Sequence, residues 1–238
     1  QSNVAQFYND RGVVYQKWGK YKKAISEYGK AIELNSEYVN AYNNRGIAYY
    51  YLGEFDKAVR DYDKAIQLNP ECDFAYNNRG HSYGILGEYE KALNDLKKAI
   101  ELNQNDINAY NNRGLIYVRL GEYAKAIKDY DKVIRLDSNN AKAYNNRGDA
   151  YNCLEDYDKA LADLDKAIQL KPEFANPYKH YGVVYRKKGE YEKAIEYLTK
   201  AIERNPKYKE AYEERAEVYR LIGEVSKAEA DVKKAEKL

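Results

Sequence analysis

The hexapeptide Ala41-Tyr42-Asn43-Asn44-Arg45-Gly46 occurs four times in this chain, and each copy begins 34 residues after the previous one. The other exact copies begin at Ala75, Ala109 and Ala143. Related hexapeptides continue the spacing in both directions and begin at Phe7, Pro177 and Ala211. A fixed period of this length is the signature of a solenoid, in which one small structural unit is stacked repeatedly. We therefore expect seven stacked repeats that work through an extended surface rather than a closed pocket.

Each repeat is predicted to form two antiparallel helices of about four turns. In residues 39–72, small and aromatic residues recur at helical spacing on both sides of Gly53. Glycine closes a helix C-terminus because it adopts the left-handed conformation. Pro70 ends the second helix, since proline disfavours helix in the residue before it. Alanine recurs at one place of the second helix in every repeat, which indicates close packing: Ala24, Ala58, Ala92, Ala126, Ala160, Ala194 and Ala228.

The repeat resembles the tetratricopeptide repeat family, whose pattern is Trp-x2-Leu-Gly-x2-Tyr, then Ala-x3-Phe, then Pro. The matching residues here are Tyr42-x2-Arg45-Gly46-x2-Tyr49, then Ala58-x3-Tyr62, then Pro70. The resemblance implies an all-α fold, a right-handed superhelical α-solenoid of antiparallel helix pairs. It covers residues 5–238, after a short lead of residues 1–4, with repeats beginning at residues 5, 39, 73, 107, 141, 175 and 209.

The last repeat has the composition of a C-terminal cap. Glu229 and Glu236 stand where the other repeats carry Ile, Leu or Val. Those positions would contact a following repeat, so we expect the glutamates to solvate the end of the array.

Arginine replaces the leucine of the family pattern, and an acidic residue accompanies it on the second helix. Counted from the first residue of each repeat, position 7 holds Arg11, Arg45, Arg79, Arg113, Arg147 and Arg215. Position 23 holds Glu27, Asp61, Asp95, Asp129, Asp163 and Asp231. The sixth repeat loses both charges together and has Tyr181 and Tyr197 instead. We interpret the two positions as structural ion pairs rather than a ladder that faces a ligand, because an unpaired half-buried charge is costly.

Positions 5 and 6 of the first helix carry paired asparagines, although asparagine is a poor helix former. They are Asn43-Asn44, Asn77-Asn78, Asn111-Asn112 and Asn145-Asn146. In the family, the first helices line a concave groove, and this row resembles asparagine ladders that hold the main chain of an extended peptide. A carboxamide suits that role because it both donates and accepts hydrogen bonds. The alternative is a remnant of repeat duplication, in which one asparagine bonds to a neighbouring helix.

The residues that vary between repeats are expected to give the groove its specificity. The candidates beside the asparagines are Ile47, Tyr50, His81, Leu115, Asp149, Lys179 and Arg186. The surface is predicted to be apolar and aromatic near repeats 2 to 4 and basic at repeat 6. Gly84, inside a helix, suggests a pocket beside His81.

Composition and charge exclude several classes of function. Lys and Arg total 40 against 38 Asp and Glu, so no basic field for nucleic acid or a membrane surface is expected. No apolar run approaches the roughly 20 residues of a membrane span. Cys72 and Cys153 match no metal or redox spacing, which favours a reducing, cytoplasmic location. The chain has no Met and begins at Gln1, so we expect a processed or excised end.

We find no catalytic motif and predict no enzyme activity, cofactor or metal. The resemblance implies a protein-interaction scaffold that binds an extended peptide or partner segment. Two alternatives stay open: a self-associating structural array, with a homo-oligomer formed through the groove or the first repeat, and the substrate-recruiting part of a larger enzyme.

Overall fold

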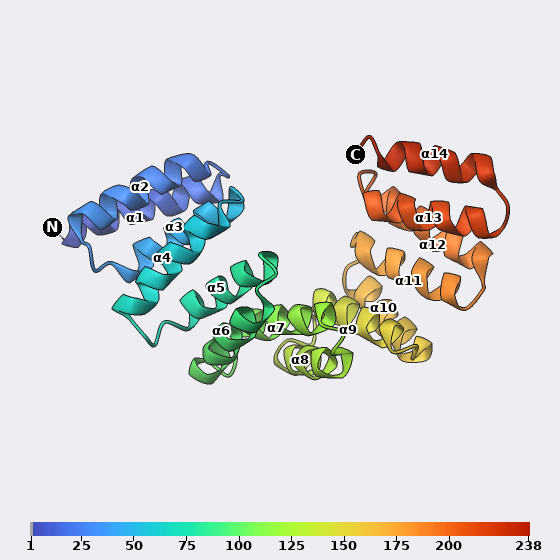
Figure 1. Cartoon of the computed structure of the whole chain (residues 1–238), viewed down its shortest axis with the longest axis horizontal. Helices are drawn as coiled ribbons and strands as arrows, with labels where there is room; N and C mark the ends of the chain where they lie inside the picture. Colours follow the sequence, from blue (N-terminus) through green and yellow to red (C-terminus); the bar gives the residue numbers. More distant parts are fainter. Residues whose placement is uncertain (1) are drawn as a thin grey trace. The chain divides into compact units, whose positions relative to one another are not determined.

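The computed structural model describes residues 2–238, which form fourteen α-helices and no strand. Their contacts gather into two compact bodies, one up to Ile116 and one from Tyr117 onward. We call them the N-terminal and C-terminal bodies. In Figure 1 consecutive helices within each body lie side by side as hairpins. The chain is therefore all-α, built from helix pairs as predicted.

In the N-terminal part of the chain, the helices are α1 (Ser2–Lys17), α2 (Tyr21–Leu34), α3 (Val39–Tyr51), α4 (Phe55–Leu68), α5 (Asp73–Ile85), α6 (Tyr89–Leu102) and α7 (Ile107–Arg119). The remaining helices are α8 (Tyr123–Leu136), α9 (Ala141–Cys153), α10 (Tyr157–Leu170), α11 (Ala175–Lys187), α12 (Tyr191–Arg204), α13 (Lys209–Leu221) and α14 (Val225–Ala235). The first helices of repeats 2 to 7 begin at the residues that the period indicates. Residues 2–4 of the expected lead belong to α1, and residue 1 lies outside the described range.

Left-handed residues end the first helices, as the glycine pattern predicts. Gly53 has φ +75°, and glycines with similar φ values occupy the same place in repeats 1, 3, 4, 6 and 7. The fifth repeat has Glu155 there, with φ 60°. The turn is thus kept in every repeat, although one repeat lacks the glycine that adopts it without strain.

Small residues let the helices of a pair approach closely. A Cβ on Gly46 would lie 2.6 Å from the Tyr62 ring, so the aromatic side chain fills the space that glycine leaves. The recurring alanines of the second helices are 0–2% exposed. The core is therefore a series of thin layers between helices, and the first helices stay free to present polar side chains.

Candidate functional site

Arginine at position 7 is paired within its own repeat, as we interpreted from the sequence. Arg45 donates from Nε and Nη2 to Asp61, with both distances 2.7 Å. Equivalent pairs at 2.6–2.8 Å join Arg11 to Glu27, Arg79 to Asp95, Arg147 to Asp163 and Arg215 to Asp231. In the sixth repeat the Tyr181 and Tyr197 rings stack instead, with centroids 4.4 Å apart. These residues hold the helix pair together.

Position 25 of the preceding repeat also contacts position 7, which the sequence reading missed. Arg79 Nη1 donates to Asp63 at 2.5 Å, and Arg147 Nη1 donates to Asp131 at 2.6 Å. Arg215 Nη1 donates to Thr199 at 2.9 Å. The recurrence of acidic residues at position 25 was the available signal. In these three repeats the guanidinium therefore joins two repeats as well as two helices.

The asparagines of the N-terminal body form hydrogen bonds between neighbouring repeats. Nδ2 of Asn44 donates to Oδ1 of Asn9 at 3.0 Å. The bonds from Asn78 to Asn43 and from Asn112 to Asn77 repeat the arrangement at 2.9 Å. Asparagines at position 5 are buried and those at position 6 are half-buried. Position 6 therefore forms the accessible side of the row, and position 5 supports it from within.

The row changes in the C-terminal body, where the sixth repeat has Lys179 and His180 at positions 5 and 6. Nδ2 of Asn145 donates to Oδ1 of Asn146 at 3.1 Å, inside the same repeat. His180 is buried, which lowers the pKa of its imidazole to about 4. Asp149, a predicted groove residue, lies 3.8 Å from His180 Nδ1. His180 is therefore a neutral, buried side chain at neutral pH.

The positive charges predicted to face the groove in the sixth repeat are partly neutralised by groups of the neighbouring repeats. Arg186 lies 3.2 Å from the Glu214 carboxylate. Lys187 Nζ donates to the carbonyl of Asn152 at 3.2 Å, and Lys179 is half-buried. The basic character predicted for repeat 6 is thus reduced by its neighbours.

A recess lies between α3 and α5 in the N-terminal body. Its volume is about 220 Å³, and it is lined by Ile47, Tyr50, Tyr51, Tyr62, Asn78 and His81. The Tyr50 and His81 rings are 5.1 Å apart, and Tyr50 Oη lies 3.4 Å from His81 Nε2. The structure therefore brings together four of the predicted groove residues, while Leu115 lies half-buried on α7.

Gly84 does not create this recess. A Cβ on Gly84 would lie 2.5 Å from Cδ1 of Ile116, so the space beside the glycine is already filled by a core side chain. Our expectation of a pocket opened by Gly84 is wrong, because the recess is formed by position-12 and position-13 aromatic residues of the preceding repeat. Tyr62 was not expected to line it.

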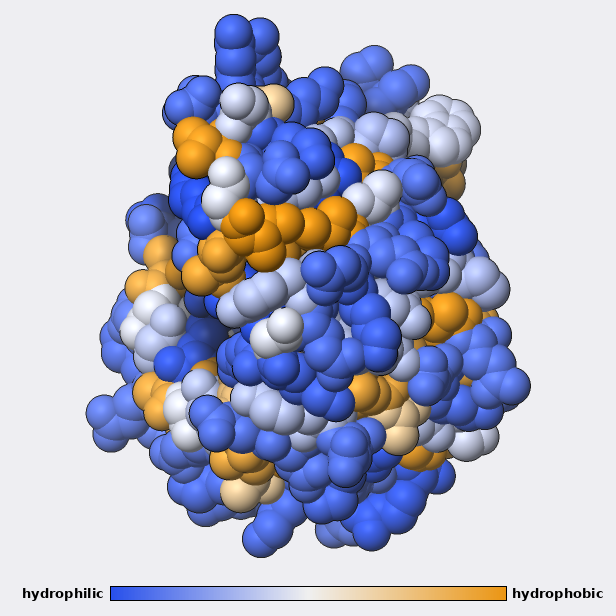
Figure 2. Space-filling model, turned by 90° about the vertical axis from the view of Figure 1, so that its right-hand side faces the viewer, coloured by the Kyte–Doolittle hydropathy of each residue, from blue (hydrophilic) through white to orange (hydrophobic). Residues whose placement is uncertain are grey.

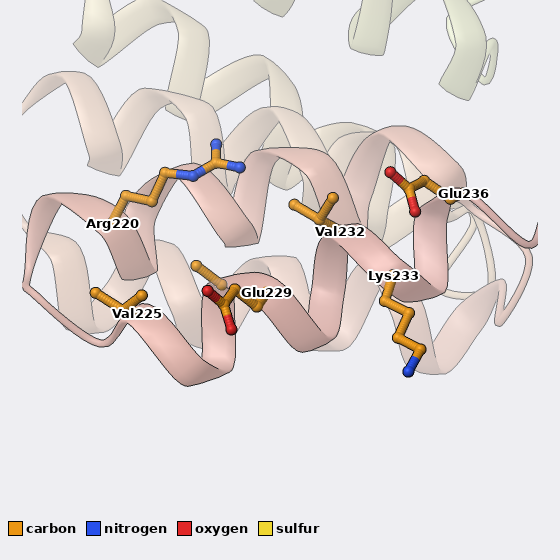
Figure 3. A pocket seen from close by; sticks show the side chains of 7 residues that line it. Arg220, Val225, Glu229, Val232, Lys233 and Glu236 are labelled. Atoms are coloured by element: carbon orange, nitrogen blue, oxygen red, sulfur yellow. The ribbon is translucent and has the colours of Figure 1, made fainter.

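A second hollow, of about 560 Å³, lies on α13 and α14 (Figure 3). Apolar Val225 and Val232 are surrounded there by Arg220, Glu229, Lys233 and Glu236 (Figure 3). The mixed charges give it no single electrostatic character. Assignment of this repeat as a cap stays a prediction.

Other site types are not found among residues 2–238. No group of three or more His, Cys, Asp or Glu side chains is placed to hold a metal, and no described helix is long and apolar enough to cross a membrane. Burial raises the pKa of both cysteine thiols, so neither is an activated thiolate. On the face drawn in Figure 2, hydrophilic side chains predominate and hydrophobic ones form one narrow band and several small groups.

Sequence profiles of known families match most of the chain. The profile described as tetratricopeptide repeat matches residues 39–72, 141–174 and 176–208. The profile described as TPR repeat matches residues 18–53, 80–121 and 114–152. The chain belongs to the tetratricopeptide repeat family. No curated protein sequence matches it significantly.

Solved structures of tetratricopeptide repeat proteins are similar to this chain. One from Parabacteroides merdae ATCC 43184 has a TM-score of 0.83 and 22% identity, over 99% of this chain and 93% of that one. YrrB, described as a TPR protein with an unusual peptide-binding site, has a TM-score of 0.60 and 27% identity, over 77% of this chain and 95% of that one. A chain of the APC/C hetero-tetramer Cut9–Hcn1 has a TM-score of 0.80 and 22% identity, over 90% of this chain but only 42% of that one.

Tetratricopeptide repeat arrays are in general non-enzymatic scaffolds for protein–protein interaction, and the fold supports that role here.

Proposed function

We propose that this tetratricopeptide repeat protein holds an extended peptide segment of a partner against its first helices, through the position-6 asparagines. The observation that carries the proposal is that Asn44, Asn78 and Asn112 of the N-terminal body stay half-buried while a hydrogen bond orients each carboxamide. The duplication alternative expects the same bonds, and the experiment below separates the two. Each bond uses one N–H of the carboxamide. The second N–H and the remaining acceptor capacity of Oδ1 stay available.

A fixed carboxamide is well suited to bind a peptide main chain. Its orientation is set before the partner arrives, so little side-chain entropy is lost on binding. Donor and acceptor on one group match the N–H and C=O of an extended peptide. Such contacts are insensitive to the partner's sequence, so selectivity would come from neighbouring residues such as Ile47, Tyr50 and His81. In the other body, the equivalent candidates are Asn146, Asp149, Lys179 and Arg186.

The description of YrrB as a peptide-binding TPR protein supports this proposal by analogy. It supplies a precedent at 27% identity, and the argument rests on the asparagines of this chain.

The experiment compares two matched triple variants. Asn44, Asn78 and Asn112 replaced by Ala removes the accessible carboxamides, whereas Asn9, Asn43 and Asn77 replaced by Ala removes their buried partners. Both variants break the same three bonds between repeats. Peptides selected from a random phage-displayed library on the unmodified protein serve as probes, and fluorescence anisotropy gives their affinity.

We expect the position-6 variant to bind these peptides about ten-fold or more weakly, since three hydrogen bonds of about 0.5–1.5 kcal/mol are lost. The position-5 variant should lose less affinity, because its position-6 carboxamides remain although they are no longer held in place, provided that circular dichroism shows it folded. Methylation of the peptide's main-chain nitrogens should also weaken binding. Equal affinity in both variants, or no selected peptide at all, would contradict the proposal.

A second candidate function is self-association through α1, with another copy of this chain as the partner. Phe7, Val14 and Trp18 are 58%, 44% and 64% exposed. The residues equivalent to Phe7 and Val14 in the second repeat, Ala41 and Ala48, are fully buried. Sedimentation equilibrium should then show a dimer that becomes a monomer on Phe7→Asp with Val14→Asp. A monomer for the unmodified chain at high micromolar concentration would exclude this candidate.

A further inference from the structure

The recess between α3 and α5 has the size of one side chain rather than of a small-molecule site. Its volume of about 220 Å³ is below the range of roughly 300–1,000 Å³ that is typical of ligand pockets. Ile47, Tyr50 and Tyr51 come from α3, while Asn78 and His81 come from α5. It therefore lies beside the position-6 asparagine of the third repeat.

Tyr62 of α4 adds a hydroxyl group to the lining of this recess. Its side chain is 1% exposed, and the glutamine that accepts from the equivalent tyrosine of the first repeat is absent here. In the first repeat, by contrast, the hydroxyl of the equivalent Tyr28 donates to Gln16 Oε1 at 3.1 Å. The second repeat has Tyr50 where the first has Gln16. A hydroxyl group that lines a recess can donate a hydrogen bond to, or accept one from, a polar group that enters it.

The fold itself does not require this hydroxyl. The residues equivalent to Tyr62 in repeats 3, 5 and 6 are leucines, namely Leu96, Leu164 and Leu198, and all three are fully buried. Burial also raises the pKa of Tyr62, so its proton is retained and available for donation. Tyrosine also occupies this position in repeats 1 and 4, as Tyr28 and Tyr130, and in the second repeat its side chain lines the recess.

Aromatic rings form the walls and are held in place by their neighbours. The Tyr51 ring stacks on Tyr21 with centroids 4.9 Å apart and 9° between the planes. The Tyr50 ring packs edge-on against Phe55 at 5.4 Å. Nδ2 of Asn78 is held by Asn43 at 2.9 Å, which fixes the orientation of its Oδ1. The recess thus has preformed flat walls and hydrogen-bonding groups of fixed direction.

The charge of the lining narrows the class of ligand. None of the six lining residues is acidic, and none is Lys or Arg. A buried ammonium or guanidinium group would lack a counter-ion, and a buried carboxylate would lack a cation. A purely apolar side chain would form no hydrogen bond with the Tyr62 hydroxyl. A neutral aromatic side chain with a polar group meets both requirements, since its ring packs on the walls and its O–H or N–H bonds to Tyr62 or Asn78.

We infer that this recess is a specificity subsite that takes one Tyr or Trp side chain of the bound partner. The inference rests on the proposed function for the main chain that presents this side chain. The recess itself is testable without any peptide.

The test uses the side-chain analogues p-cresol and 3-methylindole, titrated into the full chain and followed by NMR of the histidine side chains. The chain has only two histidines. His81 lines the recess and reports binding, whereas the buried His180 lies on α11 and serves as an internal reference. Toluene and methylguanidinium are titrated in parallel as the apolar and cationic alternatives.

We expect p-cresol and 3-methylindole to shift the His81 signals at concentrations at which toluene and methylguanidinium do not. Tyr62→Phe should weaken p-cresol binding about five- to ten-fold, and the matched control Tyr28→Phe should leave it unchanged. Ile47→Trp, which fills the recess, should abolish it. Tighter binding of toluene or methylguanidinium than of p-cresol would overturn the inference, and so would equal p-cresol affinity in Tyr62→Phe.

The outcome is separable from that of the asparagine experiment. Loss of peptide binding in the position-6 variant together with no p-cresol binding would reject only the subsite. Specific p-cresol binding together with unchanged peptide affinity in that variant would reject only the main-chain proposal.

Discussion

Arginine at position 7 departs from the leucine of the family pattern, and the structure explains how the charge is accommodated. Side-chain exposures of 23% for Arg45 and 9% for Asp61 place the pair at the edge of the core. The pair is bidentate, which is the strong geometry for a guanidinium and a carboxylate. The Arg79 and Arg147 side chains each reach a further carboxylate in the preceding repeat. Loss of one partner would therefore leave a poorly solvated charge, while loss of both would not.

Replacing Arg45 by Leu should destabilise the chain by about 2–3 kcal/mol, because Asp61 loses its partner. Arg45→Leu with Asp61→Leu should recover most of that loss. Urea unfolding of the unmodified chain, Arg45→Leu, Asp61→Leu and the double variant gives the four free energies of a double-mutant cycle. If the double variant loses as much free energy of unfolding as the two single variants together, Arg45 and Asp61 do not stabilise the fold as a pair.

Stability should fall in acid because of His180. Its pKa is lowered from 6.5 to about 4 in the folded chain by burial. Between these values the unfolded chain binds a proton that the folded chain does not, so stability is fully present above about pH 6.5 and decreases as the pH falls toward 4. The loss amounts to at most about 3 kcal/mol. His180→Asn, which installs the asparagine of the preceding repeats, should flatten this part of the profile of unfolding free energy. Parallel profiles for the two proteins would show that His180 is not responsible.

At the scale of elements, the turn after each first helix is the most regular feature of the chain. A left-handed residue closes that helix in every repeat, and Glu155 adopts φ 60° where the other repeats have glycine. Because a Cβ is disfavoured in this conformation, α9 ends at a position that carries strain.

Glu155→Gly should therefore stabilise the chain by about 1 kcal/mol. The matched change Gly189→Ala, at the same place after α11, should destabilise it by a similar amount. Thermal unfolding measures both, and a neutral or destabilising Glu155→Gly would mean that the Glu155 side chain has compensating contacts.

The helices could be predicted because their ends are encoded locally. Gly53 and Pro70 act within a few residues, and the period then transfers the assignment to every repeat. The partnership of Arg45 with Asp61 was predictable as well, since Tyr181 and Tyr197 replace both charges together. The sequence left two roles open for the asparagines: holding a peptide, or bonding to a neighbouring helix as Asn78 does with Asn43. Helical spacing could not decide, because it does not show which asparagine faces the neighbouring helix. The role of Tyr62 could not be predicted, since its residue type and buried position are those of an ordinary core residue.

At the scale of the whole molecule, stability in a repeat protein is the sum of terms within repeats and between neighbours. Within the N-terminal body the α3–α4 pair packs against α2 and α5, and within the C-terminal body the α11–α12 pair packs against α10 and α13. Among residues 2–238, the α1–α2 and α13–α14 pairs each pack against one neighbouring pair. Exposed apolar residues such as Val4 and Val225, 50% and 59% exposed, mark these pairs. Local opening should therefore require less free energy there.

Hydrogen exchange followed by mass spectrometry should show the fastest helical exchange in α1–α2 and α13–α14, and the slowest in α3–α4 and α11–α12. Arg215→Leu provides a sharper test, because it leaves Asp231 without its partner in the last repeat. We expect it to accelerate exchange in α13 and α14 by about ten-fold or more, as a loss of at least 1.4 kcal/mol implies, while α3–α6 stay unchanged. Acceleration of the same size in every helix would mean that the chain opens as one cooperative unit. That result would contradict the nearest-neighbour description and would require long-range coupling between repeats.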